Sequence, residues 1–176
     1  MVIEKWLENT KGLTMNFFTK EWCFGDLDTK KSEDILKKYR SYIRDIQFKI
    51  SFPLRVMATN LNLHDGILNK VCFSLERRVL ILQGIFGDLQ TKYFFLKIKY
   101  KNISDLNSDD LINVFQNQVA EILIDEIEVV SDTIFSHKII FSSKKEIDLR
   151  FEDVEISIRN ADALYYKKQV CSLEII

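Results

Sequence analysis

At Gly66 the spacing of the apolar residues changes from a helical period to a strand period, which limits the chain to folds that keep helices and strands in separate regions. Before this point, residues 32–47 predict an amphipathic helix with Ser32 as its N-cap. Its apolar stripe consists of Ile35, Tyr39, Tyr42, Ile43 and Ile46. A short second helix is expected to begin near Pro53, because proline is favoured in the first turn of a helix.

Beyond Gly66 the apolar residues alternate in short runs that are separated by turn residues. Residues 71–75, 79–86 and 92–100 form three such runs, and the short turns between them favour an antiparallel meander. Further strands are predicted over 122–130 and 134–142, after a short helix over residues 109–118 that Ser108 caps, and the C-terminal stretch can add an edge strand.

The last long alternating segment, from Glu146 onward, shifts its apolar parity by one residue at Glu152-Asp153. A shift of one residue turns every following side chain to the opposite face of the strand. The sequence therefore predicts a bulge or a tight turn at this point.

Helices followed mainly by strands indicate an α+β fold, with N-terminal helices packed on a mainly antiparallel β-sheet meander. The chain has 176 residues, of which 47% are hydrophobic, and this suits a single globular domain over residues 1–176. Residues 15–65 are expected to be mainly helical and residues 66–176 mainly β. Residues 1–14 are either an N-terminal extension or a helix that packs Trp6 onto the domain.

The chain contains no segment that predicts a membrane span, because its longest purely apolar runs have only four residues. The three cysteines, Cys23, Cys72 and Cys171, are far apart and odd in number, so they indicate neither a metal-binding pair nor a disulfide framework. We therefore expect a cytoplasmic protein with reduced thiols and no membrane association.

Charge is divided unevenly along the chain. Residues 1–104 hold 18 Lys and Arg against 11 Asp and Glu, a net charge of +7, whereas residues 105–176 hold 7 against 15, a net charge of −8. One interpretation is internal pairing, with Lys97 and Lys99 opposite Glu126 and Glu128. The other is an exposed acidic sheet face, built by Asp125, Glu126, Glu128 and later carboxylates, that attracts a basic protein partner.

The two histidines, His64 and His137, are the candidate residues for chemistry. His64 beside Asp65 has the composition of a base, a ligand-binding pair or a metal ligand, but the same segment also suits a turn that ends a helix. His137 shares its parity with Phe135 and Ile139, which is typical of a core or edge residue. No metal-ligand spacing accompanies either histidine, so neither a metal nor another cofactor is predicted.

Nucleic-acid binding and the familiar catalytic motifs receive little support. Tyr93, Phe95, Lys97 and Lys99 form an aromatic and basic stripe on one face of a strand, which is a feature of single-strand binders. The isoelectric point near 6.2 disfavours that function. The sequence lacks a G-x-S-x-G motif and a glycine-rich phosphate loop, so we assign no catalytic residue.

Four segments resemble an uncharacterised family of bacterial proteins that is known only as a domain of unknown function. They are Met15 to Trp22 (MNFFTKEW), Asn62 to Gly66 (NLHDG), Ile124 to Glu128 (IDEIE) and Phe135 to Lys138 (FSHK). The resemblance covers residues 15 to about 160 and implies no catalytic residue. It directs attention first to His64, Asp65 and His137.

The leading functional hypothesis is a non-enzymatic protein-interaction module, similar to an immunity or adaptor protein. Its acidic sheet face, with Asp125, Glu126 and Glu128, would bind a basic protein. The alternative is a small-molecule-binding protein or a hydrolase that uses His64 and Asp65. A purely structural subunit is the third hypothesis.

Overall fold

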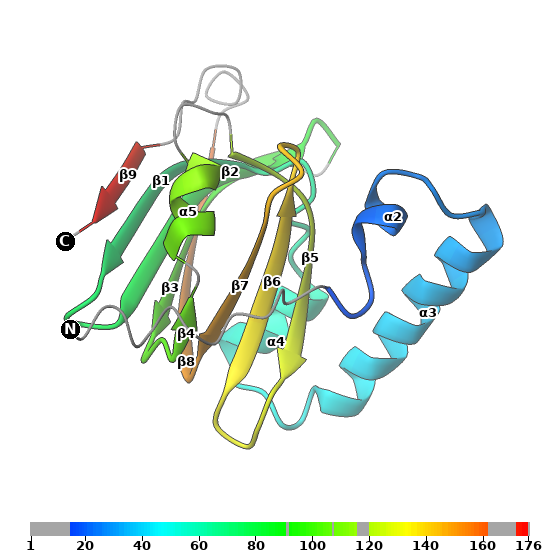
Figure 1. Cartoon of the computed structure of the whole chain (residues 1–176), viewed down its shortest axis with the longest axis horizontal. Helices are drawn as coiled ribbons and strands as arrows, with labels where there is room; N and C mark the ends of the chain where they lie inside the picture. The colour runs from blue at the N-terminus through cyan, green and yellow to red at the C-terminus, as the bar shows by residue number, and fades with distance from the viewer. Residues whose placement is uncertain (1–14, 91, 107, 116–119, 162–171, 176) are drawn as a thin grey trace.

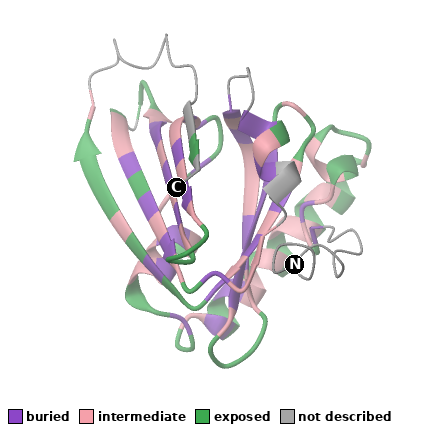
Figure 2. Cartoon of the chain, turned by 60° about the vertical axis from the view of Figure 1, so that its left-hand side comes forward, coloured by how far each residue is buried: buried purple, intermediate pink, exposed green. Residues whose placement is uncertain are grey.

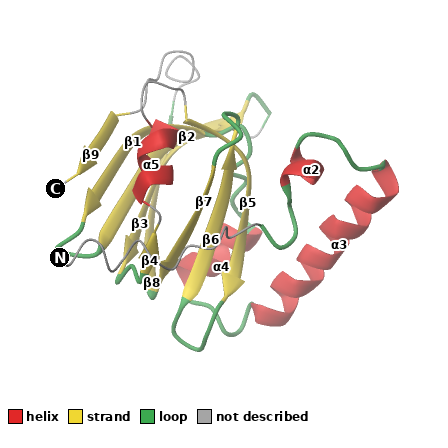
Figure 3. Cartoon of the chain, viewed as in Figure 1, coloured by secondary structure: helices red, strands yellow, loops and turns green. Residues whose placement is uncertain are grey.

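The structure is a computed structural model that describes residues 15–90, 92–106, 108–115, 120–161 and 172–175. Three helices come first, α2 (Lys20–Cys23), α3 (Thr29–Ile46) and α4 (Phe52–Thr59), and α5 (Ser108–Phe115) lies among the strands. Figure 3 shows strands in most of the remaining chain. The α+β prediction is confirmed. The two alternatives for residues 1–14 concern a segment outside the described residues.

Within the described residues, nine strands form one sheet. Eight of them follow the order β4-β7-β6-β5-β1-β2-β3-β8 with antiparallel neighbours, and β9 pairs with β1 in parallel. The strands are β1 (Ile67–Ser74), β2 (Val79–Asp88), β3 (Lys92–Lys101), β4 (Asp105–Leu106), β5 (Ala120–Val129), β6 (Phe135–Phe141), β7 (Glu146–Phe151), β8 (Asp153–Asn160) and β9 (Ser172–Ile175).

The sheet has two halves that face each other, a β1 half (β1, β2, β3, β8 and β9) and a β5 half (β4, β5, β6 and β7) (Figure 1). The two halves meet where the start of β5 pairs with the start of β1, through Ala120 with Leu68 and Glu121 with Ile67. Figure 2 shows buried residues on the strands of both halves, and every residue of β6 is buried. The hydrophobic core therefore lies between the two halves.

The chain also crosses from one half to the other at Glu152, between β7 and β8. There the Glu152 N–H donates to the Lys101 carbonyl at 3.2 Å, which holds the crossing against the end of β3. The parity shift predicted at Glu152-Asp153 is this crossing.

Helix α3 begins earlier than the sequence predicted. Its N-cap is Asp28, whose side chain accepts a hydrogen bond from the Lys31 N–H at 2.9 Å, and Ser32 lies within the first turn. The prediction of Ser32 was wrong because aspartate caps a helix as well as serine does. Helix α4 begins after Ser51 and has Pro53 in its first turn, as predicted.

The segment before α2 packs on the outer side of the β5 half. Glu126 is fully buried, and its carboxylate accepts hydrogen bonds from the backbone N–H groups of Asn16 (2.6 Å), Phe17 (2.9 Å) and Phe18 (3.2 Å). Phe18 also packs against Ile140 of β6. One buried carboxylate thus fixes the path of the chain into α2.

The charges of β3 pair within the β1 half. Lys99 lies 3.3 Å from Glu155 of β8, and Lys101 lies 3.0 Å from Asp153 and also contacts Glu155. Of the two lysines predicted to pair internally, Lys99 does so, but with Glu155 and not with Glu126 or Glu128, because β8 is the neighbour of β3 and β5 is not. Among the described residues, no helix is long and apolar enough to cross a membrane.

We expect Glu126→Ala to lower the free energy of unfolding by about 2–4 kcal/mol, since the change leaves buried N–H groups of residues 16–18 without an acceptor. Glu121→Ala removes a half-buried carboxylate from the same strand and should cost about 0.5 kcal/mol. Urea unfolding measures both values. Equal losses in the two variants would contradict the role assigned to Glu126.

Candidate functional site

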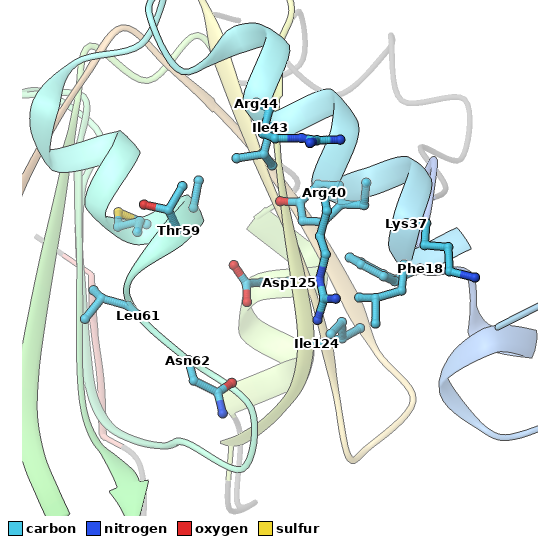
Figure 4. A pocket seen from close by; sticks show the side chains of 14 residues that line it. Phe18, Lys37, Arg40, Ile43, Arg44, Thr59, Leu61, Asn62, Ile124 and Asp125 are labelled. Carbon is cyan, nitrogen blue, oxygen red and sulfur yellow. The ribbon is translucent and has the colours of Figure 1, made fainter. Parts of the chain in front are cut away.

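A pocket of about 690 Å³ lies beside β5, between α3, α4 and the segment 60–62 that follows α4 (Figure 4). It exists because β5 pairs with β1 only at its first two residues, so that most of one β5 edge has no neighbouring strand. A register irregularity between Ile122 and Ile124 accompanies this separation. The helices α3 and α4 cover the edge that β1 leaves open.

Two tyrosines of α3 replace the missing strand on this edge. The Ile127 N–H donates to the Tyr39 hydroxyl and the Val129 N–H donates to the Tyr42 hydroxyl, both at 2.9 Å. A helix cannot offer a row of backbone acceptors to a strand edge, because its own carbonyls are bonded along the helix axis. Side-chain hydroxyls satisfy the strand instead, and they fix α3 along the length of β5.

The wall of the pocket between α3 and α4 is apolar. Ile43 of α3 and Met57 of α4 are buried, and Leu61 is half-buried. These residues continue directly into the core that lies between the sheet halves. Burial of a ligand against them would be favourable at roughly 25 cal/mol per Å² of apolar surface.

The rim of the pocket on α3 is cationic. Lys37, Arg40 and Arg44 follow one another at helical spacing, and all three line the pocket. Lys37 forms long ion pairs with acidic residues of its own helix, and Arg44 donates to Ser41 Oγ at 3.0 Å. Arg40 has no ion pair or hydrogen bond to any residue that the structure describes, and Figure 4 shows it extending from α3 towards β5.

Asp125 connects the pocket to a polar chain in the core. Its carboxylate lies 3.0 Å from His137 Nε2, and His137 Nδ1 lies 2.7 Å from the Tyr100 hydroxyl. Burial, and then the negative charge of Asp125, raise the pKa of Tyr100 well above its ordinary value. Tyr100 therefore keeps its proton. When its hydroxyl donates to Nδ1, the hydrogen on Nε2 is the one that His137 donates to Asp125.

The three acidic residues predicted on β5 lie in different surroundings. Asp125 faces the pocket and His137, whereas Glu126 is the buried anchor of residues 16–18. Burial raises the pKa of Glu126, although its three backbone N–H donors act in the opposite direction. Glu128 contacts the Asn16 side chain and lies 3.0 Å from the ammonium group of Lys138.

His64 and Asp65 lie in the turn before β1. The His64 Nδ1 contacts the Leu123 carbonyl on the edge of β5, and its Nε2 lies 3.3 Å from the Asp65 carboxylate. Both side chains are exposed, and neither lines the pocket. The backbone of Asp65 has a φ of 60°, which is typical of a turn. No group of three or more potential metal ligands occurs among the described residues.

The sequence pointed to Asp125 and His137 as candidate residues, but it did not point to Tyr39, Tyr42 or Arg40. The signal for the tyrosines was present, because two hydroxyls on the apolar stripe of a helix need hydrogen-bond partners wherever they are buried. The spacing of Lys37, Arg40 and Arg44 also placed three cations on one helix face. Neither the tyrosines nor the cations indicated that α3 would pack against the edge of β5.

Comparisons with protein families, with curated proteins and with solved structures found no significant match to this chain. The resemblance to a bacterial family of unknown function stays a prediction.

Stability should fall as the pH rises above about 10. Burial raises the pKa of Tyr39 and of Tyr100, whereas an unfolded chain loses tyrosine protons near pH 10. Protonated tyrosines therefore give their full contribution to the free energy of unfolding below pH 10. Above pH 10 this free energy falls by about 1.4 kcal/mol per pH unit for each tyrosine. Urea unfolding between pH 8 and pH 11 measures the slope. Tyr100→Phe should make it shallower, and an unchanged slope would contradict this assignment.

Proposed function

We propose that this protein is a non-catalytic binding module whose ligand enters the pocket between α3, α4 and β5. The ligand has an apolar body, which packs on Ile43, Met57 and Leu61, and an acidic group, which pairs with Arg40. The observation that carries the proposal is Arg40, which pairs with none of the described residues and lies at the rim of a pocket whose inner wall is apolar.

The binding site of this interaction module is the pocket beside α3 and not the acidic face of the sheet. The carboxylates that suggested an acidic face, Glu126 and Glu128, are engaged by residues 16–18 and by Lys138. A basic partner would have to compete with those contacts, whereas a ligand at Arg40 displaces no ion pair or hydrogen bond to the part of the chain that the structure describes. The charge of the pocket rim favours an acidic ligand over a basic one.

The hydrolase alternative that uses His64 and Asp65 stays a prediction. Both side chains are open to solvent and absent from the pocket lining, although His64 contacts the Leu123 carbonyl next to the pocket residues Ile124 and Asp125. A substrate there would gain little apolar contact. We also place the protein in the cytoplasm, a proposal supported by the free thiols of Cys23 and Cys72.

The fluorescent probe 1-anilinonaphthalene-8-sulfonate has the required chemistry, an aromatic body with one sulfonate. We expect saturable binding to the folded protein. Arg40→Gln should weaken binding about tenfold, as expected when a charge-assisted hydrogen bond is lost. Lys38→Gln removes a cation from the same helix outside the pocket lining, and it should change the affinity less than about twofold.

A third variant tests the apolar wall. Ala58→Phe places a bulky side chain on the α4 side of the pocket and should reduce probe binding strongly. Thermal melting confirms that each variant is folded before its affinity is measured. Equal affinities of the Arg40 and Lys38 variants, or probe binding that Ala58→Phe leaves intact, would exclude this pocket as the site.

A further inference from the structure

On the β5 edge that α3 covers, one residue has a backbone N–H and a backbone carbonyl with no partner among the described residues. Ile127 and Val129 direct their N–H groups away from β6, to the tyrosines of α3. Because backbone directions alternate along an antiparallel strand, Asp125 directs its N–H and its carbonyl to the same edge. Across the described part of the chain, neither of these two groups of Asp125 forms a hydrogen bond.

This open position is only one residue long. On one side the Leu123 carbonyl is occupied by His64, and on the other the Ile127 N–H is occupied by Tyr39. A full additional strand would have to displace both side chains. A single residue of an extended chain can pair with Asp125 without displacing either of them.

The groups around Asp125 indicate which chemical groups the incoming ligand residue has. In an antiparallel pair, the N–H of the incoming residue donates to the Asp125 carbonyl. The Asp125 N–H donates in turn to the carbonyl oxygen of the incoming residue. If that oxygen belongs to a carboxylate, its negative charge also suits Arg40, which lines the same pocket and has no ion pair with any residue in the described ranges. The apolar wall formed by Ile43 and Met57 then receives the side chain.

We infer that the pocket binds the carboxyl terminus of an extended peptide whose last residue is apolar. The last residue pairs with the backbone of Asp125, and its carboxylate meets Arg40. The inference rests on the proposed function and names the ligand of the same site. A pocket of about 690 Å³ has the size that encloses ligands larger than one amino acid, which favours a peptide over a free amino acid.

The test compares three probes by calorimetric titration. They are acetyl-Gly-Gly-Leu with a free carboxylate, the same peptide with an amidated end, and the free acid with its leucine nitrogen methylated. We expect the free acid to bind at least tenfold more tightly than either of the others, since amidation removes the charge and methylation removes the donor. The Asp125 amide should show one of the largest ¹⁵N–¹H shift changes on binding.

Variants separate the two interactions. Arg40→Gln should abolish the preference for the acid over the amide, and Lys38→Gln should keep it. Equal binding of the acid and the amide by the wild-type protein overturns the inference, as does acetyl-leucine that binds as tightly as the peptide. If the sulfonate probe binds as proposed while the peptide acid does not, the pocket remains a binding site and only its assignment to peptide carboxyl termini fails. If neither binds, both proposals fail.

Discussion

The hydrogen bonds from β5 to Tyr39 and Tyr42 determine how the helical and β parts of this protein fit together. An uncovered strand edge presents unpaired backbone groups that can recruit other chains, and proteins usually cover such edges. Here the cover is a helix held by two phenolic hydroxyls one helical turn apart. The two bonded residues of β5, Ile127 and Val129, are two positions apart, and the two tyrosines of α3 are three positions apart. These spacings are similar enough in length for both hydrogen bonds to form. The orientation of α3 follows from that match.

The pocket is a consequence of the same arrangement. A helix axis and a strand edge can stay in register for only a short distance, because the two backbones rise by different amounts per residue. At Asp125 the cover of α3 ends before the turn at His64 begins, and the gap leaves two backbone groups open. The ligand site therefore arises where two kinds of secondary structure fail to match.

The polar chain Tyr100–His137–Asp125 links three strands through the core. Tyr100 comes from the β1 half, and the other two residues come from the β5 half. Burying such groups is costly unless each has a partner, and here each one has. The chain fixes the Asp125 side chain on the inner side of β5. The backbone of Asp125 thereby stays turned towards the pocket.

Most of the secondary structure follows from local patterns, whereas the site does not. The alternation after Gly66 predicted β1, β2 and β3, and the parity shift at Glu152 predicted a bulge or a tight turn at the point where the chain crosses from β7 to β8. These features depend on neighbours within a few residues. The parallel pairing of β9 with β1 joins residues about 100 positions apart, and no local pattern encodes it. The contact between α3 and the edge of β5 also joins residues far apart in the sequence, so no local pattern encodes it either.

The charge of a sequence segment does not by itself predict the charge of a surface, because secondary structure decides which side chains share a face. The acidic residues of β5 are divided between two faces. Asp125 meets an imidazole on one face, whereas Glu126 and Glu128 share the other face, where Asn16 and Lys138 contact both of them. A run of like charges on a strand is thus divided by the strand's own geometry. On a helix, cations three or four residues apart stay on one face. For this reason the basic residues of α3 form a common rim while β5 contributes only Asp125 to the same lining, so that cations outnumber carboxylates around this pocket.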